Sequence, residues 1–421
     1  MNILIINYYH WPAAGAHAFR WSALSKHFAK QGHNVFVITS PVRGAPQLDV
    51  SPNLTITRCG LVRLEQSLIT DFRPSDNRVI AIFKPIKNLI RRIYRMFYWP
   101  DALWHWLPFA LRQLYRYRNQ NFDFVVSYYP SFGAHIAGFI QKYFFSKENT
   151  TWILDYGDPF SLSYDWQPNN YFLYKYLNFF AEKLFFKYGT PVFTNNQTRD
   201  EYTRTLGINA GFVIPNMVDI NLFYISKAKI YNKSIDTITL TYLGAFYRDV
   251  REPFQLLKLL EKLNSLSSIE FKLKIYGPDH GFDLSTTSYP FVKYYGSISR
   301  EEAFAVMQNS QILVNVENRN CLMTPSKVVE CIATGLPILN IVNGEPQHKP
   351  KDKYCEIGYL VNAHGNEVGK KLQILLRELI RLASLDRANI DQVKWVLAGN
   401  YILEDCASTY LSFVKGQQRF D

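Results

Sequence analysis

The stretch from residue 313 to residue 340, LVNVENRNCLMTPSKVVECIATGLPILN, decides the fold, because it has the pattern of a strand, a loop, a short helix and a second strand. Three apolar residues mark the first strand: Leu313, Val314 and Val316. Thr324 suits the cap of the helix, Pro325 its first turn and Gly335 its end, and residues 336–339 begin the next strand. Such a βαβ unit predicts an α/β fold with a parallel sheet.

The helix of this unit carries a candidate phosphate site. It begins where the preceding strand ends, and its N-terminal amides and dipole attract an anion there. Lys327 and Glu330 lie three residues apart and so share one face. Lys327 suits the charge of a diphosphate, and Glu330 suits a vicinal diol such as a ribose. The same two residues equally suit an ordinary ion pair on the surface of a helix.

The composition indicates a globular protein with a negatively charged partner. The chain has 421 residues, of which 48% are hydrophobic, and a formal net charge of +12. Such a charge suits nucleic acid, an anionic membrane or a phosphorylated substrate. Residues 84–118 hold one acid, Asp101, and eight basic residues: Lys84, Lys87, Arg91, Arg92, Arg95, Arg112, Arg116 and Arg118.

This basic segment predicts contact with an anionic membrane. Residues 84–97 have a helical period that separates an apolar face from a basic face carrying Lys84, Lys87, Arg91 and Arg95, with Arg92 beside them. Trp99, Trp104 and Trp106 follow, and basic helices beside aromatic residues suit a headgroup interface. The alternative is a domain helix with a solvated basic side. No nucleic-acid-binding motif accompanies the charge, so nucleic acid is not expected as a partner.

Cysteine spacing and hydropathy limit the other classes of protein. The five cysteines have no C-x-x-C spacing, and the chain has no Asp-x-Asp, so neither a disulfide framework nor a metal site is predicted. The N-terminal MNILIINYY has the pattern of a strand rather than a signal peptide, and no apolar run reaches about 18 residues. We therefore expect a cytoplasmic protein, soluble or peripheral on the inner face of the cell membrane.

Strand and helix signals alternate twice along the chain, which predicts two α/β domains. The first spans residues 1–215 and the second residues 216–395, with a polar, irregular link from residue 215 to residue 236. Residues 396–421 are expected to form a C-terminal helix that crosses back to the first domain.

Further candidate site residues follow the predicted strands. The segment YLGAFYRDVR, residues 242–251, places Arg248 and Arg251 where either could reach the same phosphates as Lys327. Asp155 and Asp158 end a strand of the first domain, where either carboxylate could orient or deprotonate an acceptor hydroxyl, although both also fit an Asx turn before a proline. His17 and His135 lie near the predicted ligand edge too, and a structural or solvent-facing role suits each of them.

These motifs together resemble the family-4 glycosyltransferases of GT-B fold, especially bacterial ones that build surface polysaccharides. The resemblance spans most of the chain. It rests on the Gly15 loop and on WPD, SYYPSFGAHIAG, DYGDPFS, VIPNMVD, YLGAFYRDVREP, KIYGPDHG, VKYYGSISREEAF and, most specifically, PSKVVECIATGLPIL. It implies two Rossmann-like domains facing a cleft, and a nucleotide sugar, used as substrate rather than cofactor, that is held mainly by the second domain. It also implies transfer with retention at the anomeric carbon.

The resemblance also assigns roles to individual residues. Glu330 resembles the carboxylate on the donor ribose, Arg251 and Lys327 the diphosphate ligands, and the turn at residues 296–298 part of the base pocket. The implied donor site comprises Gly15, Gly244, Arg248, Arg251, Ser297, Ile298, Thr324, Ser326, Lys327 and Glu330. The sequence departs from the family at Leu322, where members often have a second glutamate, and at Ala245, where many have arginine.

The resulting expectation is a retaining, metal-independent transferase that moves a sugar from a nucleotide sugar to a lipid-linked saccharide in capsule or O-antigen synthesis. Arg251, Lys327, Asp155 and Asp158 are its predicted catalytic groups. Two alternatives stay open: a sugar-nucleotide 2-epimerase, and a non-catalytic membrane- or saccharide-binding protein of the same fold, which Leu322 makes conceivable.

Overall fold

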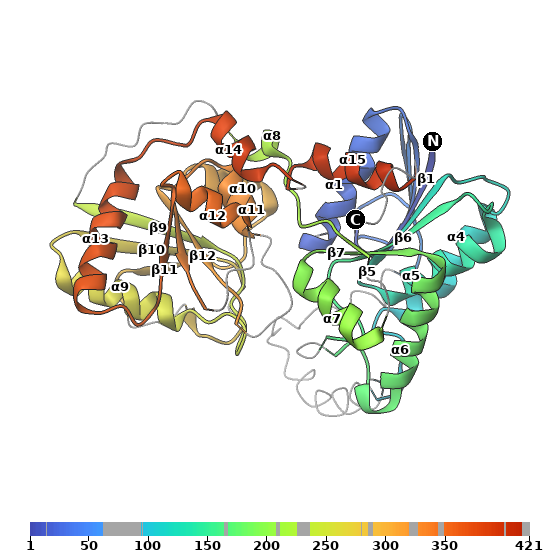
Figure 1. The fold of residues 1–421 in the computed structure, drawn as a ribbon, viewed down its shortest axis with the longest axis horizontal. Helices are drawn as coiled ribbons and strands as arrows, with labels where there is room; N and C mark the ends of the chain where they lie inside the picture. Colours follow the sequence, from blue (N-terminus) through green and yellow to red (C-terminus); the bar gives the residue numbers. More distant parts are fainter. Residues whose placement is uncertain are drawn as a thin grey trace. The chain divides into compact units, whose positions relative to one another are not determined.

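The computed structural model describes residues 1–13, 15–61, 94, 96–163, 167–207, 211–224, 236–278, 280–284, 289–319, 327–343, 349–399 and 401–414. The chain forms two compact units, one of Met1–Pro215 with Ala407–Asp421 and one of Asn216–Cys406. Each unit is an α/β domain built on its own sheet (Figure 1). The predicted fold class, with two Rossmann-like parallel-sheet domains, is confirmed.

The first domain contains an eight-stranded sheet in the order β3-β4-β2-β1-β5-β6-β7-β8. Its strands are β1 (Asn2–Asn7), β2 (Asn34–Thr39), β3 (Leu48–Ser51), β4 (Leu54–Arg58), β5 (Phe124–Tyr129), β6 (Thr151–Tyr156), β7 (Thr190–Phe193) and β8 (Phe212–Val213). All neighbouring pairs are parallel except β3 and β4. Sequence analysis did not predict this hairpin, because its edge strand is mostly exposed and lacks a continuous apolar run.

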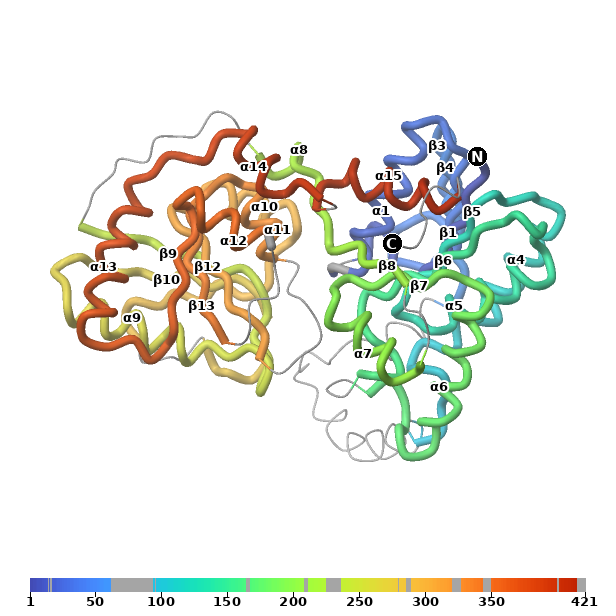
Figure 2. The backbone as a smooth tube through the Cα atoms, in the orientation of Figure 1, coloured from blue at the N-terminus to red at the C-terminus, as the bar shows by residue number. Residues whose placement is uncertain are grey.

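Helices connect and cover these strands (Figures 1 and 2). They are α1 (Ala16–Lys30), the 3₁₀ turn η1 (Trp104–Trp106), α4 (Leu107–Arg116), α5 (Phe132–Ile140), the π-helical turn η2 (Gln141–Phe145), α6 (Tyr171–Tyr188) and α7 (Asn196–Leu206). The sequence predicts one helix near residues 132–145, whereas the structure ends the α-helix at Ile140 and continues it as the π turn. The predicted basic helix at residues 84–97 lies almost entirely outside the described residues.

The second domain contains a six-stranded parallel sheet in the order β11-β10-β9-β12-β13-β14. Its strands are β9 (Thr237–Leu243), β10 (Glu270–Tyr276), β11 (Val292–Tyr294), β12 (Ile312–Val316), β13 (Ile338–Ile341) and β14 (Leu360–Ala363). Its helices are α8 (Ile220–Phe223), α9 (Phe254–Leu266), α10 (Arg300–Gln308), α11 (Lys327–Ala333), α12 (Lys349–Glu356), α13 (Gly369–Ser384) and α14 (Ile390–Leu397). The last helix, α15 (Leu403–Val414), has its first residues in this unit and the rest in the first.

The order β12, α11, β13 is the one that the sequence predicts, and the predicted helix cap at Thr324 and Pro325 lies outside the described residues. Residues of β12 and β13 are buried along their whole length and pair in parallel from Leu313–Ile338 to Val316–Ile341. Gly335 follows α11 with φ of 72° and its amide donates to the carbonyl of Ile332. Because only glycine adopts this left-handed conformation without strain, Gly335 ends the helix and turns the chain into β13.

In the first sheet, the central strands β1, β5 and β6 are buried along almost their whole length, as expected for a parallel sheet covered on both faces, whereas β10 in the second sheet alternates between buried apolar and more exposed polar residues. In a parallel sheet all strands then end at one edge, where the following loops collect their side chains. None of the described helices is long and apolar enough to cross a lipid bilayer.

Candidate active site

Three glycines end adjacent strands at the carboxyl edge of the second sheet. Gly244 directly follows β9 and Gly277 directly follows β10, whereas one residue separates Gly296 from the end of β11. The Gly244 amide donates to the Tyr276 carbonyl at 2.8 Å, and the Gly277 amide donates to the Gly296 carbonyl at 2.9 Å. A Cβ on Gly277 would lie 1.9 Å from the Gly244 carbonyl oxygen, so no other residue fits there. These glycines therefore let the loops that follow β9, β10 and β11 pack closely against one another at this edge of the sheet.

The loop after β9 carries the two arginines predicted to bind phosphate, and they point to different neighbours. Arg251 donates from Nε and Nη2 to Oδ1 of Asn318, at 3.0 and 2.6 Å, and so reaches the loop after β12. Arg248 donates from Nη2 to the Gly281 carbonyl at 3.2 Å, beyond the end of β10. Arg251 is thus fixed beside the sheet edge, while Arg248 holds the loop that follows Gly277.

Lys327 and Glu330 form an ion pair on the first turn of α11. Lys327 Nζ lies 2.5 Å from Glu330 Oε2, and Arg300 Nη1 lies 3.9 Å from Glu330 Oε1. The side chains of Lys327, Glu330 and Arg300 remain 36%, 15% and 21% exposed. One accessible carboxylate therefore lies between two cations from different helices. Sequence reasoning missed Arg300, which the signal VKYYGSIS could have revealed because it ends at the cap of α10.

The remaining predicted donor residues fall near the same edge or outside the described residues. Ser297 is exposed on the loop between β11 and α10, and Ile298 is half-buried against the domain core. Thr324 and Ser326 lie outside the described residues, as does Leu322. Ser297 lies two residues before Ser299, which caps α10 through a capping box with Glu302, and Arg300 is the first residue of that helix.

A buried polar network, which sequence reasoning missed, supports the end of β12. Glu317 Oε1 accepts from Lys351 Nζ and from Asn340 Nδ2, the latter at 2.9 Å. Asn340 also links the neighbouring strands, accepting from Asn315 at 2.6 Å and donating to Asn362 at 2.7 Å. Because Glu317 directly precedes Asn318, this network fixes the position of the partner of Arg251. The sequence offers only a weak signal, an asparagine within each of three apolar strands.

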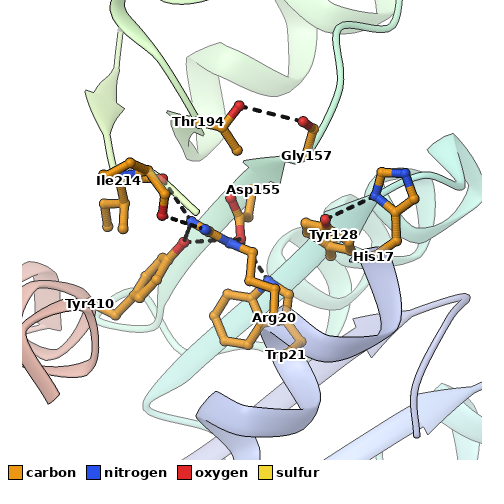
Figure 3. A network of polar contacts seen from close by, with 10 residues as sticks. His17, Arg20, Trp21, Tyr128, Asp155, Gly157, Thr194, Ile214 and Tyr410 are labelled. Carbon is orange, nitrogen blue, oxygen red and sulfur yellow. Dashed lines mark hydrogen bonds and ion pairs between the residues drawn. The ribbon is translucent and has the colours of Figure 1, made fainter. Parts of the chain in front are cut away.

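In the first domain, Asp155 is the centre of a buried network (Figure 3). Its Oδ2 accepts from Arg20 Nε at 2.9 Å, Trp21 Nε1 at 2.6 Å and the Tyr410 hydroxyl at 2.9 Å. Arg20 also donates to the carbonyls of Ile214 and Pro215. The network thus joins α1, β6, the end of the first domain and α15. Asp155 is fully buried, so its predicted contact with an acceptor is wrong, and of the two carboxylates only Asp158 is accessible.

Asp158 pairs with a histidine at the start of α1. His17 Nε2 lies 3.2 Å from Asp158 Oδ2. Figure 3 shows the contact on the other side of the ring, where Nδ1 lies 3.2 Å from the Tyr128 hydroxyl. Burial lowers the pKa of His17, but the Asp158 carboxylate outweighs burial and raises it above its ordinary value. A Cβ on Gly157 would lie 2.3 Å from the Tyr128 hydroxyl, so glycine leaves room for this cluster.

Gly15 and His135 occupy different surroundings. Gly15 precedes α1 with φ of 112° and faces open space, so it shapes the loop that leads to His17. His135 is fully buried, lies 2.8 Å from Ser127 Oγ through Nδ1, and has a pKa that burial lowers to about 3. It is therefore a neutral core residue, as the sequence suggested.

The described part of the predicted membrane segment is only partly exposed. Trp104 is 39% exposed, and Trp99 is half-buried with its Nε1 donating to Asn178. Trp106 is fully buried in the core of the domain, so its predicted contact with a membrane is wrong. Lys84, Lys87, Arg91, Arg92 and Arg95 lie outside the described residues.

Three comparisons relate this geometry to known proteins. Residues 20–222 match the family model described as Glycosyltransferase Family 4. No curated protein sequence matches the chain significantly. Among solved structures, α,α-trehalose 6-phosphate synthase from Burkholderia multivorans is 13% identical, with a TM-score of 0.60 over 99% of this chain and 98% of that one.

Two other similar structures have comparable coverage. WaaG, a glycosyltransferase involved in lipopolysaccharide biosynthesis, is 12% identical with a TM-score of 0.57 over 97% of this chain and 99% of that one. HepE from Anabaena, solved with UDP-glucose, is 11% identical with a TM-score of 0.53 over 99% and 100%. At these identities the likeness concerns the fold, which is GT-B. Residues 20–222 therefore resemble the family-4 glycosyltransferases, and the protein is a glycosyltransferase of GT-B fold.

Proposed function

We propose that the protein transfers a sugar, with retention and without a metal ion, from a nucleotide-sugar donor to a lipid-linked saccharide at the inner face of a cell membrane. The observation that carries the donor assignment is the accessible cluster of Lys327, Glu330 and Arg300. The solved structure of HepE contains UDP-glucose, which supports the same class of donor here.

The cluster provides the charges that a leaving nucleoside diphosphate needs. When the bond between the sugar and the diphosphate breaks, negative charge develops on the phosphate oxygens, and fixed cations stabilise it. Lys327 would turn from Glu330 to this phosphate, and Arg251 would contribute a second cation. Glu330, released from Lys327, would accept the hydroxyl hydrogens of the ribose.

His17 and Asp158 provide a matching polar site on the first domain, where an acceptor would bind. Both side chains are about one third exposed, at 34% and 29%. A carboxylate that holds an imidazole can orient an acceptor hydroxyl toward the anomeric carbon. The basic residues of segment 84–118 in the first domain suit an acceptor held at an anionic membrane. The role of WaaG in lipopolysaccharide biosynthesis supports a saccharide acceptor of a surface polysaccharide such as capsule or O-antigen.

The donor site can be tested with UDP and UDP-sugars as probes. Lys327→Ala and Glu330→Ala should each lower UDP binding or the rate of transfer roughly 30- to 1000-fold, because each removes a charge-assisted contact worth about 2–4 kcal/mol. Glu378→Ala is the matched control, since Glu378 forms an i,i+3 pair with Arg381 at 2.8 Å on α13. Near-normal transfer by both folded site variants would refute the proposal.

Two further measurements test the mechanism. The product of a reaction with a UDP-sugar should keep the anomeric configuration of the donor, which NMR of the product reports, and an epimer of the free donor would instead indicate the 2-epimerase alternative. Excess EDTA should leave the rate unchanged, and added magnesium or manganese should not raise it. Complete dependence on a metal ion would contradict the proposed role of Lys327 and Arg251.

A further inference from the structure

Helix α6 exposes a continuous stripe of large apolar side chains. Its members recur at the spacing i, i+1, i+4, i+5 and i+8, which places them on one side of the helix. They are Phe172 (93% exposed), Leu173 (49%), Tyr176 (82%), Leu177 (42%) and Phe180 (64%). The opposite side packs on the domain through buried Asn178, Ala181, Glu182 and Phe185. A contiguous exposed apolar patch of this kind marks an interaction surface rather than ordinary exposure.

In α6 the acidic side chain is buried, whereas the exposed charged side chains are basic. The helix contains one acidic residue, Glu182, which is fully buried, and three lysines, Lys175, Lys183 and Lys187. Lys183 and Lys187 are exposed, so every exposed charge of the helix is positive. Lys175 Nζ lies 5.5 Å from the ring centre of Tyr171, and Lys187 Nζ lies 5.8 Å from that of Tyr188. The lysine stems thus lie along aromatic rings, an arrangement that suits the boundary between apolar and charged surroundings.

The chain segment that precedes η1 is hydrogen-bonded to α6 and to its N-cap through residues outside the stripe. The Tyr174 hydroxyl donates to the Phe97 carbonyl at 2.8 Å, and Asn170 Nδ2 donates to the Met96 carbonyl at 3.4 Å. Met96 and Phe97 are themselves 50% and 64% exposed. In the sequence they directly follow the basic residues 84–95. The chain therefore joins the stripe to the most basic part of its sequence.

We propose that α6 docks the protein on an anionic lipid bilayer. The docking face comprises Met96, Phe97, Phe172, Leu173, Tyr176, Leu177 and Phe180, with Lys183 and Lys187 beside it. α6 has 18 residues and is therefore about 27 Å long, so it can lie in the plane of the headgroups with its apolar side chains in the outer acyl region. The lysines then face lipid phosphates.

Charge complementarity favours a lipid surface over a second copy of the chain. A symmetric pair of α6 helices would place the exposed lysines of each copy against a helix that has no exposed acid to offset them. An anionic bilayer provides the missing negative charge along the whole helix. The surface deepens the proposed function, because it would hold the first domain where a lipid-linked acceptor is available. Vesicle binding itself does not depend on transfer.

The decisive experiment is vesicle co-sedimentation of the full chain, with phosphatidylcholine vesicles that contain or lack phosphatidylglycerol. The wild type should bind the anionic vesicles and bind the neutral ones far less. The triple variant Phe172→Ser, Tyr176→Ser, Phe180→Ser should bind anionic vesicles at least about tenfold more weakly, because it removes most of the buried apolar area. The control Leu48→Ser, Val50→Ser alters two exposed residues on β3, at the other edge of the sheet, and should bind like the wild type.

A charge-reversal pair tests the lysines separately. Lys183→Glu with Lys187→Glu should weaken binding to anionic vesicles at least about 25-fold at low salt, since each lysine near such a surface contributes about fivefold. The effect should shrink as salt rises. Lys26→Glu with Lys30→Glu makes the same change on exposed residues of α1 and should lower binding far less.

Three outcomes would overturn the proposal: wild-type binding by the aromatic triple variant, equal binding of the wild type to neutral and anionic vesicles, or a wild-type dimer that the aromatic variant converts to a monomer without any vesicle binding. The last result would assign the face to a second copy.

UDP binding by every variant is measured in parallel. Loss of vesicle binding with intact UDP binding supports α6 docking, whereas a wild type that binds vesicles but no UDP contradicts only the donor site.

Discussion

One ion pair in each domain joins residues with a functional pattern in the sequence, and the two pairs have opposite surroundings. Arg20 and Asp155 are 2.9 Å apart with side chains 3% and 0% exposed, and Asp155 Oδ2 accepts from three donors. Lys327 and Glu330 are 2.5 Å apart with side chains 36% and 15% exposed. A sealed pair can only fix the backbone around it, whereas an accessible pair can exchange its partner for ligand atoms. The comparison assigns stability to the first pair and chemistry to the second.

Removing the buried carboxylate should have the largest effect on folding. Asp155→Ala leaves the Arg20 guanidinium buried without its counter-charge, and breaking such a pair costs about 3–5 kcal/mol of unfolding free energy. Urea denaturation followed by circular dichroism measures the loss. Asp158→Ala changes a partly exposed carboxylate in the loop after β6 and should lose less than about 1 kcal/mol. If both variants lost the same unfolding free energy, the buried and the accessible carboxylate would not differ in their contribution to stability, and the prediction would be wrong.

A second buried carboxylate, Glu182, predicts a pH dependence of stability in the first domain. Burial raises the pKa of Glu182 to about 7, and the hydrogen bond from the Tyr202 hydroxyl, at 2.9 Å, offsets burial only in part. The folded state therefore keeps a proton that the unfolded state loses near pH 4.5. This stabilisation is complete below pH 4.5 and disappears as the pH rises to 7.

Glu182→Gln should remove this dependence. At pH 8 the variant should be more stable than the wild type by roughly 3–4 kcal/mol, because a shift of one pKa unit corresponds to about 1.4 kcal/mol, and at pH 4 the two should be equal. Urea denaturation at both pH values measures the difference. Asp101, whose pKa burial raises to about 6, adds a fall in stability that both proteins share. A wild type that is more stable than the variant at pH 8 would contradict the prediction.

The sequence predicts the fold well because parallel strands carry a strong local signal. The run Leu313–Val316 and the glycine at 335 lead to β12, α11 and β13 without any tertiary information. The failures have local causes as well. The β3–β4 hairpin has no continuous apolar run. Trp106 lies in a segment rich in aromatic and basic residues, and this composition does not show that Trp106 itself is buried.

The site was predictable only where residues share one element. Lys327 and Glu330 lie on one turn of helix, so their spacing predicts their contact. Arg300 approaches Glu330 from α10, and Lys351 approaches Glu317 from α12, across 30 and 34 residues of sequence. Asp155 shows the opposite failure, since its partners Arg20 and Tyr410 are 135 and 255 residues away and convert a plausible base into a buried anchor.

The pair of His17 and Asp158 is intermediate between the two ion pairs. Asp158 raises the pKa of His17 against the opposing effect of burial, so the contact stabilises the fold fully below pH 6.5 and less as the pH rises through the higher folded pKa. Because both side chains are about one third exposed, the gain should stay under about 1 kcal/mol. Unfolding of His17→Gln at pH 6 and pH 9 checks this, and the variant should lose more at pH 6. A larger loss at pH 9 would contradict it.

The smallest effect on stability should come from the accessible pair. Lys327→Gln removes an i,i+3 ion pair whose lysine is 36% exposed, so the unfolding free energy should change by less than about 0.5 kcal/mol. The same change removes the cation proposed to face the leaving diphosphate, where fixed charge lowers the barrier rather than stabilising the fold. Stability and transfer should therefore respond in opposite order: Asp155→Ala unfolds the protein most, whereas Lys327→Gln slows transfer most among variants that stay folded. Urea denaturation and UDP-sugar turnover on one set of variants compare both quantities. If Lys327→Gln destabilised the protein by several kcal/mol, its loss of activity would say nothing about a phosphate, and the two ion pairs would have the same role.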